Sequence, residues 1–159
     1  MVTRTRSPSR QGGFTLTELM TVVAIVAILA AIAAPNMGAM IRTQRVKTAS
    51  FDVYASLTLA RSEAVKRNVS VTVTPAGATW ADGWTITDAN GNVIRNQGAY
   101  TSLTFVGPAN VTYTGAGRLS VNAAPVPFAI SAANVDPLNY RCIKLDVSGR
   151  PVSTTGVCT

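Results

Sequence analysis

Side chains that commonly perform catalysis are sparse in this sequence. Its 159 residues include no histidine, so the commonest general base is absent and no Ser–His or Cys–His nucleophile system can form. Acidic side chains are few, and their spacing matches neither a metal site nor a paired acid and base. Most fall in expected turns or on a helix face: Asp52, Glu63, Asp82, Asp88, Asp136 and Asp146. We therefore expect no catalytic residue, no metal, no cofactor and no enzymatic activity.

Two acidic turn sequences also allow an interpretation as calcium loops. Asp82-Gly83 and Asp88-Ala89-Asn90-Gly91 combine carboxylates with glycine, as calcium loops do. The same residues are the ordinary chemistry of tight turns, which is the interpretation we favour. Gly115-Ala116-Gly117-Arg118 is not expected to bind phosphate, because it lacks the Lys-Ser/Thr pair and the flanking strand and helix of a phosphate loop.

A long apolar segment follows a basic N-terminus. Residues 19–41 contain no charged side chain, and about 20 apolar residues are enough to cross a bilayer as a helix. Arg4, Arg6 and Arg10 precede the segment without any acidic residue among them. The positive-inside rule then predicts a cytoplasmic N-terminus and a single pass that exports the rest of the chain.

Two other interpretations of this segment are a buried core helix and an ordinary secretory signal peptide. Ala31-Ile32-Ala33 resembles a small-residue cleavage site after an apolar region. Glu18 argues against a signal peptide, because an ionisable group at the head of an apolar run is usually retained for a function. Pro35 lies so close to the small residues that access by a signal peptidase would be poor.

The residues before the apolar segment resemble a known processing signal. Gln11-Gly12-Gly13-Phe14-Thr15-Leu16-Thr17-Glu18 is similar to the class III signal of type IV prepilins, in which Gly-Phe-Thr-Leu-x-Glu leads directly into the transmembrane run. The resemblance implies that a prepilin peptidase cleaves between Gly13 and Phe14 and methylates the new N-terminal Phe14. It further implies that the apolar helix is retained and packs inside a fibre.

Glu18 and Pro35 stand where pilins place their glutamate and proline, so the resemblance assigns both a role in assembly. The Glu18 carboxylate would be costly in hydrocarbon unless paired, and the free amino group of Phe14 on a neighbouring subunit is a suitable cation. The alternative is that Glu18 only reaches the lipid headgroups. Pro35 removes a backbone donor, so we expect a kink or a melted stretch there.

The helix is expected to continue beyond the membrane, from about residue 14 to residue 68. Apolar residues recur at steps of three and four on one side of its second half, and charged residues fill the other sides. The apolar positions are Val46, Ala49, Val53, Leu57, Ala60 and Ala64. Residues 60–68 also resemble the end of this helix in the GspH/FimT family of minor pilins and pseudopilins.

The remaining sequence has a strand pattern. Short runs rich in β-branched or aromatic residues occupy 69–74, 84–87, 103–106, 111–114, 127–132 and 142–147, with turn residues between them. A single antiparallel sheet on the apolar side of the helix is the simplest arrangement, which makes the expected fold α+β, the type IV pilin fold. The expected divisions are a cleaved leader (1–13), a transmembrane half-helix (14–41), an amphipathic half-helix (42–68) and a β-rich head (69–159).

The only two cysteines, Cys142 and Cys158, lie near the C-terminus of the exported segment. A bond between them closes a loop of about 15 residues and stabilises the fold by about 3 kcal/mol in the chain-entropy model. Two free thiols or a metal site are the alternatives. Zinc is disfavoured because two distant cysteines without histidine supply too few ligands.

The family resemblance implies a structural role. It implies a minor pilin that primes or joins type IV pilus assembly at the bacterial inner membrane, with its head in the periplasm and later in a fibre. The alternative is a minor pseudopilin of type II secretion, similar to protein H; the cysteine pair favours a FimT/FimU-like pilus subunit. The implied partners are the prepilin peptidase, other minor and major pilins or pseudopilins, and inner-membrane lipid.

DNA is a further candidate partner, because some FimT-type minor pilins bind DNA for natural transformation through a C-terminal Gly-Arg-x-Arg motif. Gly149-Arg150-Pro151-Val152 matches only its first half. The candidate DNA contacts are Arg118, Arg141, Lys144, Gly149 and Arg150. The alternative is a solvated basic surface, and no aromatic residue interleaves with these cations as single-strand binders require.

Processing is the first testable prediction. Mass spectrometry of protein from the native host should find a mature N-terminus at Phe14 that carries one methyl group. A bulky replacement of Gly13 should block cleavage and leave the precursor in the inner membrane, because the peptidase needs close access to the backbone. A mature N-terminus at or near Asn36 would instead support the signal-peptide interpretation.

Overall fold

The computed structural model describes residues 13–120 and 127–159; for residues 32–36 it describes the backbone alone. The chain divides into two compact units, Met1–Gly38 and Ala39–Thr159. Its single long helix, α1, runs from Leu16 to Arg67, close to the bounds that the sequence predicts. The backbone of residues 32–36 is helical, so the melted stretch expected at Pro35 is absent there, and the kink stays a prediction. Among the described residues, no helix combines the length and the apolarity needed to cross a membrane.

The end of α1 is fixed by a left-handed residue. Asn68 has a φ of 53°, its amide donates to the Val65 carbonyl, and the Val69 amide reaches back to the Ala64 carbonyl. Asparagine tolerates this conformation better than most residues with a side chain, and the two bonds satisfy carbonyls that the last turn leaves unpaired. The chain therefore leaves the helix sharply and enters the first strand three residues later.

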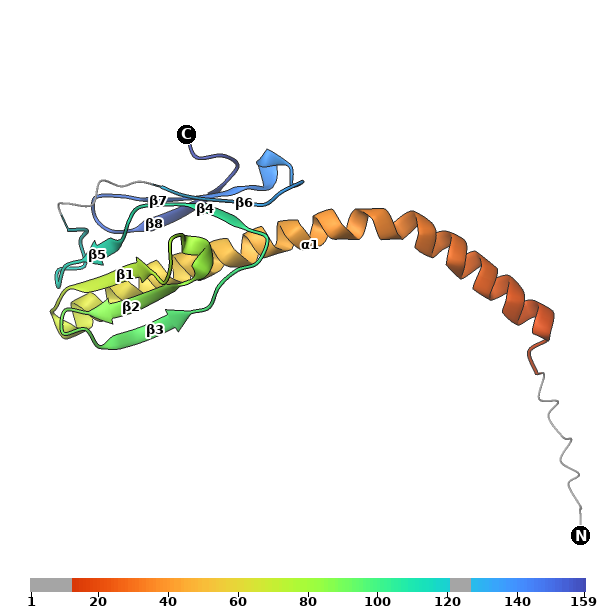
Figure 1. Cartoon of the computed structure of the whole chain (residues 1–159), viewed down its shortest axis with the longest axis horizontal. Helices are drawn as coiled ribbons and strands as arrows, with labels where there is room; N and C mark the ends of the chain where they lie inside the picture. Colours follow the sequence, from red (N-terminus) through yellow and green to blue (C-terminus); the bar gives the residue numbers. More distant parts are fainter. Residues whose placement is uncertain (1–12, 121–126) are drawn as a thin grey trace, which may run out of the picture. The chain divides into compact units, whose positions relative to one another are not determined.

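In the described part of the chain eight strands follow, and they form two antiparallel sheets rather than the single sheet expected from the sequence (Figure 1). The first sheet has the order β3-β2-β1-β5, with bounds Val71–Pro75 (β1), Trp84–Asp88 (β2), Val93–Gln97 (β3) and Val111–Tyr113 (β5). The second has the order β4-β6-β7-β8, with bounds Thr104–Val106 (β4), Phe128–Ser131 (β6), Arg141–Leu145 (β7) and Pro151–Thr155 (β8).

The sequence pattern predicts six of these strands and misses two. The missed strands, β3 and β8, each form one edge of a sheet, and most of their residues are exposed. An exposed edge strand has no buried side that demands alternating apolar residues, so the signal on which the prediction depends is absent. Two short 3-10 helices, Trp80–Asp82 and Pro137–Asn139, complete the described elements.

One core holds the second half of α1 against both sheets. All six apolar helix positions predicted from the spacing are buried, each with 2% or less of its surface exposed. From the sheets they meet side chains that alternate along the strands, such as Val71 and Val73 on β1 and Phe128 and Ile130 on β6. Three of the six helix positions are alanines, which lets the strands approach the helix axis closely.

Aromatic side chains join the two sheets to each other. The rings of Trp80 and Phe128 meet edge to face with centroids 4.8 Å apart, and Trp84 and Phe105 meet similarly at 6.3 Å. Each pair links a residue in or beside the first sheet to one in the second. Such edge-to-face pairs add about 0.5–1.5 kcal/mol beyond the area that they bury.

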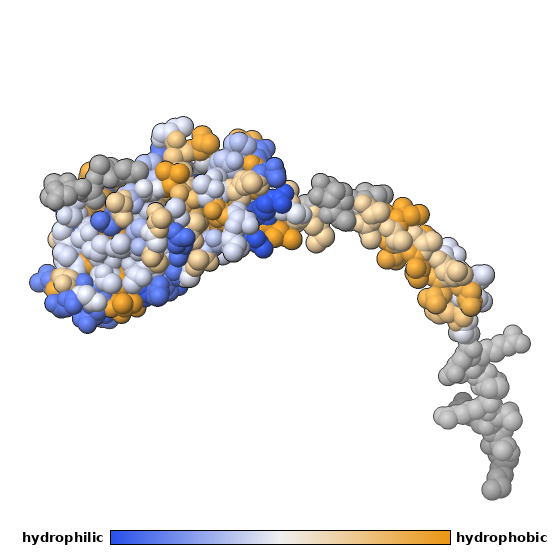
Figure 2. Space-filling view, viewed as in Figure 1, coloured by the Kyte–Doolittle hydropathy of each residue, from blue (hydrophilic) through white to orange (hydrophobic). Residues whose placement is uncertain are grey.

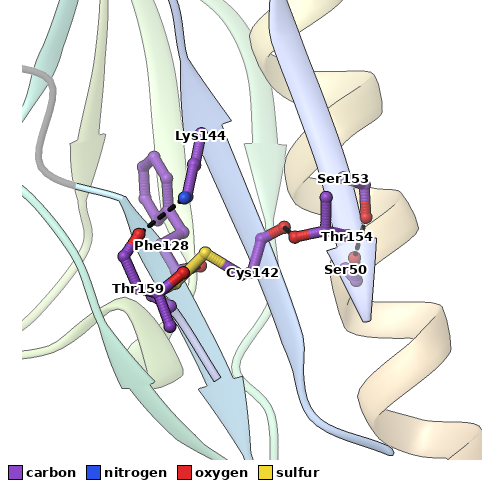
Figure 3. The surroundings of a disulfide bond; sticks show 8 residues. Ser50, Phe128, Cys142, Lys144, Ser153, Thr154 and Thr159 are labelled. Carbon is purple, nitrogen blue, oxygen red and sulfur yellow. Dashed lines mark hydrogen bonds between the residues drawn. A yellow bond between two sulfur atoms is a disulfide. The ribbon is translucent and has the colours of Figure 1, made fainter. Parts of the chain in front are cut away.

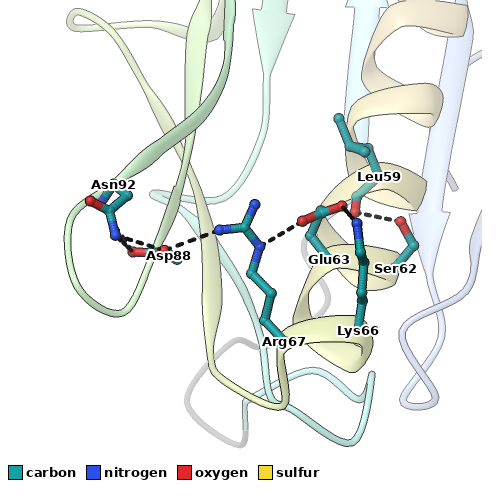
Figure 4. A network of polar contacts seen from close by, with 7 residues as sticks. All are labelled: Leu59, Ser62, Glu63, Lys66, Arg67, Asp88 and Asn92. Atoms are coloured by element: carbon teal, nitrogen blue, oxygen red, sulfur yellow. Dashed lines mark hydrogen bonds and ion pairs between the residues drawn. The ribbon is translucent and has the colours of Figure 1, made fainter.

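A polar network ties the end of α1 to the turn between β2 and β3 (Figure 4). Arg67 donates to Glu63 over 2.6 Å and to Asp88 over 3.4 Å. The Asp88 carboxylate also accepts from the Asn90 and Asn92 amides and from the Asn92 side chain. These hydrogen bonds hold the pKa of Asp88 below its ordinary value, and the bond from the Asn92 side chain contributes most.

This network makes head stability depend on pH. Because the pKa of Asp88 is lower in the folded than in the unfolded chain, its stabilising contribution is complete above the unfolded pKa, about 4, and is lost as the pH falls through the folded value. Thermal melts recorded as the pH is lowered from neutral should show this loss, and Asp88→Asn should flatten it. Arg95→Gln, an exposed change on β3, should leave the pH profile as it is. An unchanged profile in Asp88→Asn would contradict the assignment.

Candidate functional site

The first unit presents an apolar helical surface. Within Met1–Gly38, every large apolar side chain described between Phe14 and Leu29 is more than half exposed. Figure 2 shows these residues as a nearly continuous hydrophobic stretch of α1. Their positions are Phe14, Leu16, Leu19, Met20, Val22, Val23, Ile25, Val26, Ile28 and Leu29. An apolar surface of this extent marks a segment that contacts lipid or other protein chains.

The start of α1 is closed by a capping box. The Glu18 carboxylate accepts from the Thr15 amide over 2.9 Å, and the Glu18 amide donates to the Thr15 hydroxyl over 3.2 Å. A reciprocal pair of this kind satisfies two amides that the first turn leaves without helical partners. From the sequence, Glu18 is expected to pair in assembly or to reach the lipid headgroups, although the spacing Thr-x-x-Glu before an apolar run is itself a signal for this cap.

The expected processing site lies directly before the capping box. Gly13 and Phe14 precede α1 in extended or irregular backbone, and Phe14 is 87% exposed. A Cβ added to Gly13 would meet no atom within 4 Å. The peptide bond between the two residues is therefore open to solvent, as a peptidase substrate must be.

The disulfide predicted between Cys142 and Cys158 is present, with Cα atoms 5.2 Å apart (Figure 3). Cys142 is fully buried on β7, and Cys158 lies beyond the end of β8. The bond therefore fastens the last residues of the chain across the second sheet. Lys144 adds to this by donating to the carbonyl of Thr159 over 2.6 Å.

The candidate DNA contacts do not form one surface. Arg141 and Lys144 are three residues apart on β7, so they point to opposite faces of the sheet. The turns that carry Arg118 and Arg150 are neighbours. A Cβ added to Gly149, next to Arg150, would lie 2.8 Å from the carbonyl oxygen of Gly117, next to Arg118.

An acidic residue accompanies Arg150. Asp146 accepts from the Arg150 amide over 2.9 Å and from the Ser148 hydroxyl over 2.6 Å. These hydrogen bonds lower the pKa of Asp146, and the bond from Ser148 contributes most. Its carboxylate stays charged and offsets part of the positive potential at the turn. DNA binding by these residues stays a prediction.

No group of three or more metal-ligating side chains occurs in the part of the chain that the structure describes. The two acidic turns use their carboxylates internally. Asp82 accepts from the Thr79 amide and hydroxyl, and Asp88 accepts from the amides of its own turn. Both arrangements are the hydrogen bonds of ordinary turns.

Comparisons with known proteins identify the family. A family model described as "Type II transport protein GspH" matches residues 49–149, which is more than half of the chain. The chain belongs to the GspH family. A second model, described as "Prokaryotic N-terminal methylation motif", matches residues 8–34 of this GspH-family chain and includes Gly13, Phe14 and Glu18. The family resemblance inferred from the sequence is thereby confirmed.

Solved structures support the same fold for this GspH-family chain. A crystal structure of the type IV minor pilin FimU of Pseudomonas aeruginosa is 24% identical and has a TM-score of 0.60, covering 70% of this chain and 89% of FimU. FimU in another crystal form gives 26% identity and a TM-score of 0.57, covering 68% and 91%. Among curated proteins, none matches the sequence significantly. The predicted pilin fold, a long helix packed on antiparallel strands, is confirmed.

The disulfide gives a stability prediction. Cys142→Ser should lower the free energy of unfolding by about 3 kcal/mol under oxidising conditions, because the closed loop no longer restricts the unfolded chain. Denaturant titration with and without reductant provides the measurement. The reduced parent protein should approach the variant, and a variant as stable as the oxidised parent would show that the bond contributes nothing.

Proposed function

We propose that this chain is a non-enzymatic minor subunit that primes or joins type IV pilus assembly at the bacterial inner membrane. The observation that carries the proposal is the exposed apolar half of α1, which begins at the capped Glu18 within the residues matched by the methylation motif. A segment of this kind needs lipid before assembly and neighbouring helices after it. Residues 14–41 would supply both contacts, with residues 1–13 removed as the leader.

Processing would prepare the start of the helix for assembly. Cleavage between Gly13 and Phe14 by a prepilin peptidase would leave a methylated amino group on Phe14, two residues before the first helical residue. The Glu18 carboxylate would then pair with the amine of a neighbouring subunit, and this pairing would set the axial register of the fibre. The pilins on either side are the partners that this proposal implies.

The head would act outside the membrane. Residues 42–68 and 69–159 belong to the unit Ala39–Thr159, which contains the whole core described above and the disulfide. A disulfide suits an oxidising compartment, so we assign this unit to the periplasm and later to the fibre surface.

The second candidate function is that of a minor pseudopilin in type II secretion. Membership of the family of the type II transport protein GspH supports it, whereas the similarity to FimU supports a pilus. We favour the pilus because the solved structures that resemble this chain are type IV minor pilins, and because of the C-terminal disulfide.

The proposal is tested at Glu18 with a variant that separates the charge from the cap. Glu18→Gln retains a side-chain acceptor for the Thr15 amide but removes the negative charge. We expect incorporation into sheared fibres to fall about tenfold or more, because a charge-pairing partner is lost in an apolar surrounding. Immunoblots of fibre and membrane fractions from the native host provide the measurement.

Thr15→Ala is the matched control, because it removes the hydroxyl of the cap and keeps the carboxylate. It should assemble better than Glu18→Gln, and both variants should retain the parent's melting temperature for the head. Equal loss of assembly in the two variants would mean that the cap, not the charge, is what assembly requires.

A further inference from the structure

Among the described residues, no strand pairs with one side of the β8 backbone. Within this part of the chain β8 is the last strand of its sheet and pairs only with β7. The Asp146 amide bonds to the Arg150 carbonyl at one end of this ladder, and the Gly156 amide bonds to the Tyr140 carbonyl at the other. Since bonded pairs alternate in an antiparallel ladder, residues 152 and 154 face β7. Ser153 and Thr155 therefore direct their amides and carbonyls outwards.

This edge lacks the usual protection against another strand. The sequence of β8 is Pro-Val-Ser-Thr-Thr, without a charged side chain, and only its first residue is a proline. Natural edge strands are commonly guarded by charges, prolines or covering elements. By comparison, the exposed edge strand β3 carries Arg95 in its middle.

A groove runs between this edge and the helix. It has a volume of about 370 Å³ and is lined by Lys47, Ser50, Phe51, Tyr54, Arg141 and Ser153. The four helix residues follow the spacing i, i+3, i+4, i+7, so they share one face of α1. Figure 3 shows β8 beside this part of the helix, where the hydroxyls of Ser50 and Ser153 lie 3.2 Å apart.

The walls of the groove combine apolar and basic groups. Phe51 is 69% exposed although it lies on the helix that carries the core, and Tyr54 is 38% exposed beside it. Arg141 is on the same face of the sheet as Ile143, whose side chain is buried against the core, so the arginine is directed to the helix side. No acidic residue lines the groove, and within the described residues Lys47 and Arg141 have no ion-pair partner.

We propose that this groove binds an extended acidic segment of a partner protein, which adds a strand to the free edge of β8. The segment's backbone would pair with Ser153 and Thr155, its inward side chains would cover Phe51 and Tyr54, and its carboxylates would meet Lys47 and Arg141. The proposal concerns the head alone and does not rest on how the chain is processed or which fibre it joins.

The charge and the backbone together select this occupant. A second copy of the chain is disfavoured because residues 39–159 carry more basic than acidic side chains, so two heads repel each other. A single-stranded nucleic acid would suit the cations and aromatic rings, but it has no backbone donors and acceptors arranged to match a β-strand edge. A peptide can use the cations, the aromatic rings and the unpaired strand edge together.

The test uses the full chain in detergent micelles and a fluorescein-labelled peptide of about eight residues that alternates valine with threonine and carries two aspartates. Fluorescence anisotropy should show saturable binding. The same peptide with lysines in place of the aspartates should bind at least about tenfold more weakly, since like charges then meet at the groove. A version with alternate backbone amides methylated should not bind, because it cannot pair with the edge of β8.

Variants of the chain locate the binding. Lys47→Gln and Arg141→Gln should each weaken binding of the acidic peptide about three- to fivefold, as expected for ion pairs near a protein surface. Arg95→Gln, on the edge of the other sheet, is the matched control and should leave binding unchanged. Ser153→Pro removes an outward amide that β7 does not use, so it should abolish binding while the melting temperature confirms that the head is folded.

Three outcomes would overturn the proposal. The first is no saturable binding of the acidic peptide, and the second is equal weakening by Arg141→Gln and Arg95→Gln. The third is tighter binding of a labelled single-stranded oligonucleotide that Arg141→Gln weakens and Ser153→Pro does not, which would assign the groove to nucleic acid. If Ser153→Pro does not fold, the methylated peptide decides the backbone requirement: binding as tight as that of the parent peptide would contradict strand addition.

Discussion

The structure of the head depends on one apolar stripe of α1. Val46, Val53 and Leu57 supply volume, while the alanines between and after them let the strands come close to the helix. Neither four-stranded sheet could hide an apolar face alone, and each uses this stripe as its second layer. The helix continues for 30 residues before the stripe begins, and the large apolar side chains described in that part lie outside the core of the head. One helix thus carries both a buried apolar stripe and an exposed apolar stretch.

The edges of the fold are secured by local polar and covalent contacts, not by a larger core. Arg67 and Asp88 join the end of α1 to the β2–β3 turn, and Cys142 joins β7 to the C-terminal residues. The first contact lies at the turn between β2 and β3, and the second holds Cys158, beyond the end of β8, to Cys142 within β7. Among the described residues, no strand pairs with the outer edge of β8, although β8 itself lies inside the loop that the disulfide closes.

The sequence predicts the elements in which apolar residues recur at regular spacing and misses the elements in which they do not. The six helix positions from Val46 to Ala64 are all buried because burial of one helix face forces the 3.6-residue spacing. The strands β3 and β8 are not predicted, because exposed edge strands lack the alternation of apolar and polar residues. The division into two sheets is not predicted either, because it depends on pairing between segments that are distant in the sequence. Of the expected site, the disulfide is present, whereas the placement of Arg141 and Lys144 on opposite faces of β7 follows only from knowing that both lie on one strand.

Glu18 caps the helix in the single chain, and the proposed assembly would give its carboxylate a second role. In the single chain its carboxylate accepts from the Thr15 amide and hydroxyl, so the charge is hydrogen-bonded at the positive end of a helix before any partner is present. A cap of this kind lowers the cost of holding a carboxylate at the head of an apolar segment. Pairing with the amine of a neighbouring Phe14 need not break the cap, because a carboxylate has two oxygens and can accept from both partners. In the assembly proposed here, the capped conformation would hold the charge at the end of the helix that meets the neighbouring Phe14.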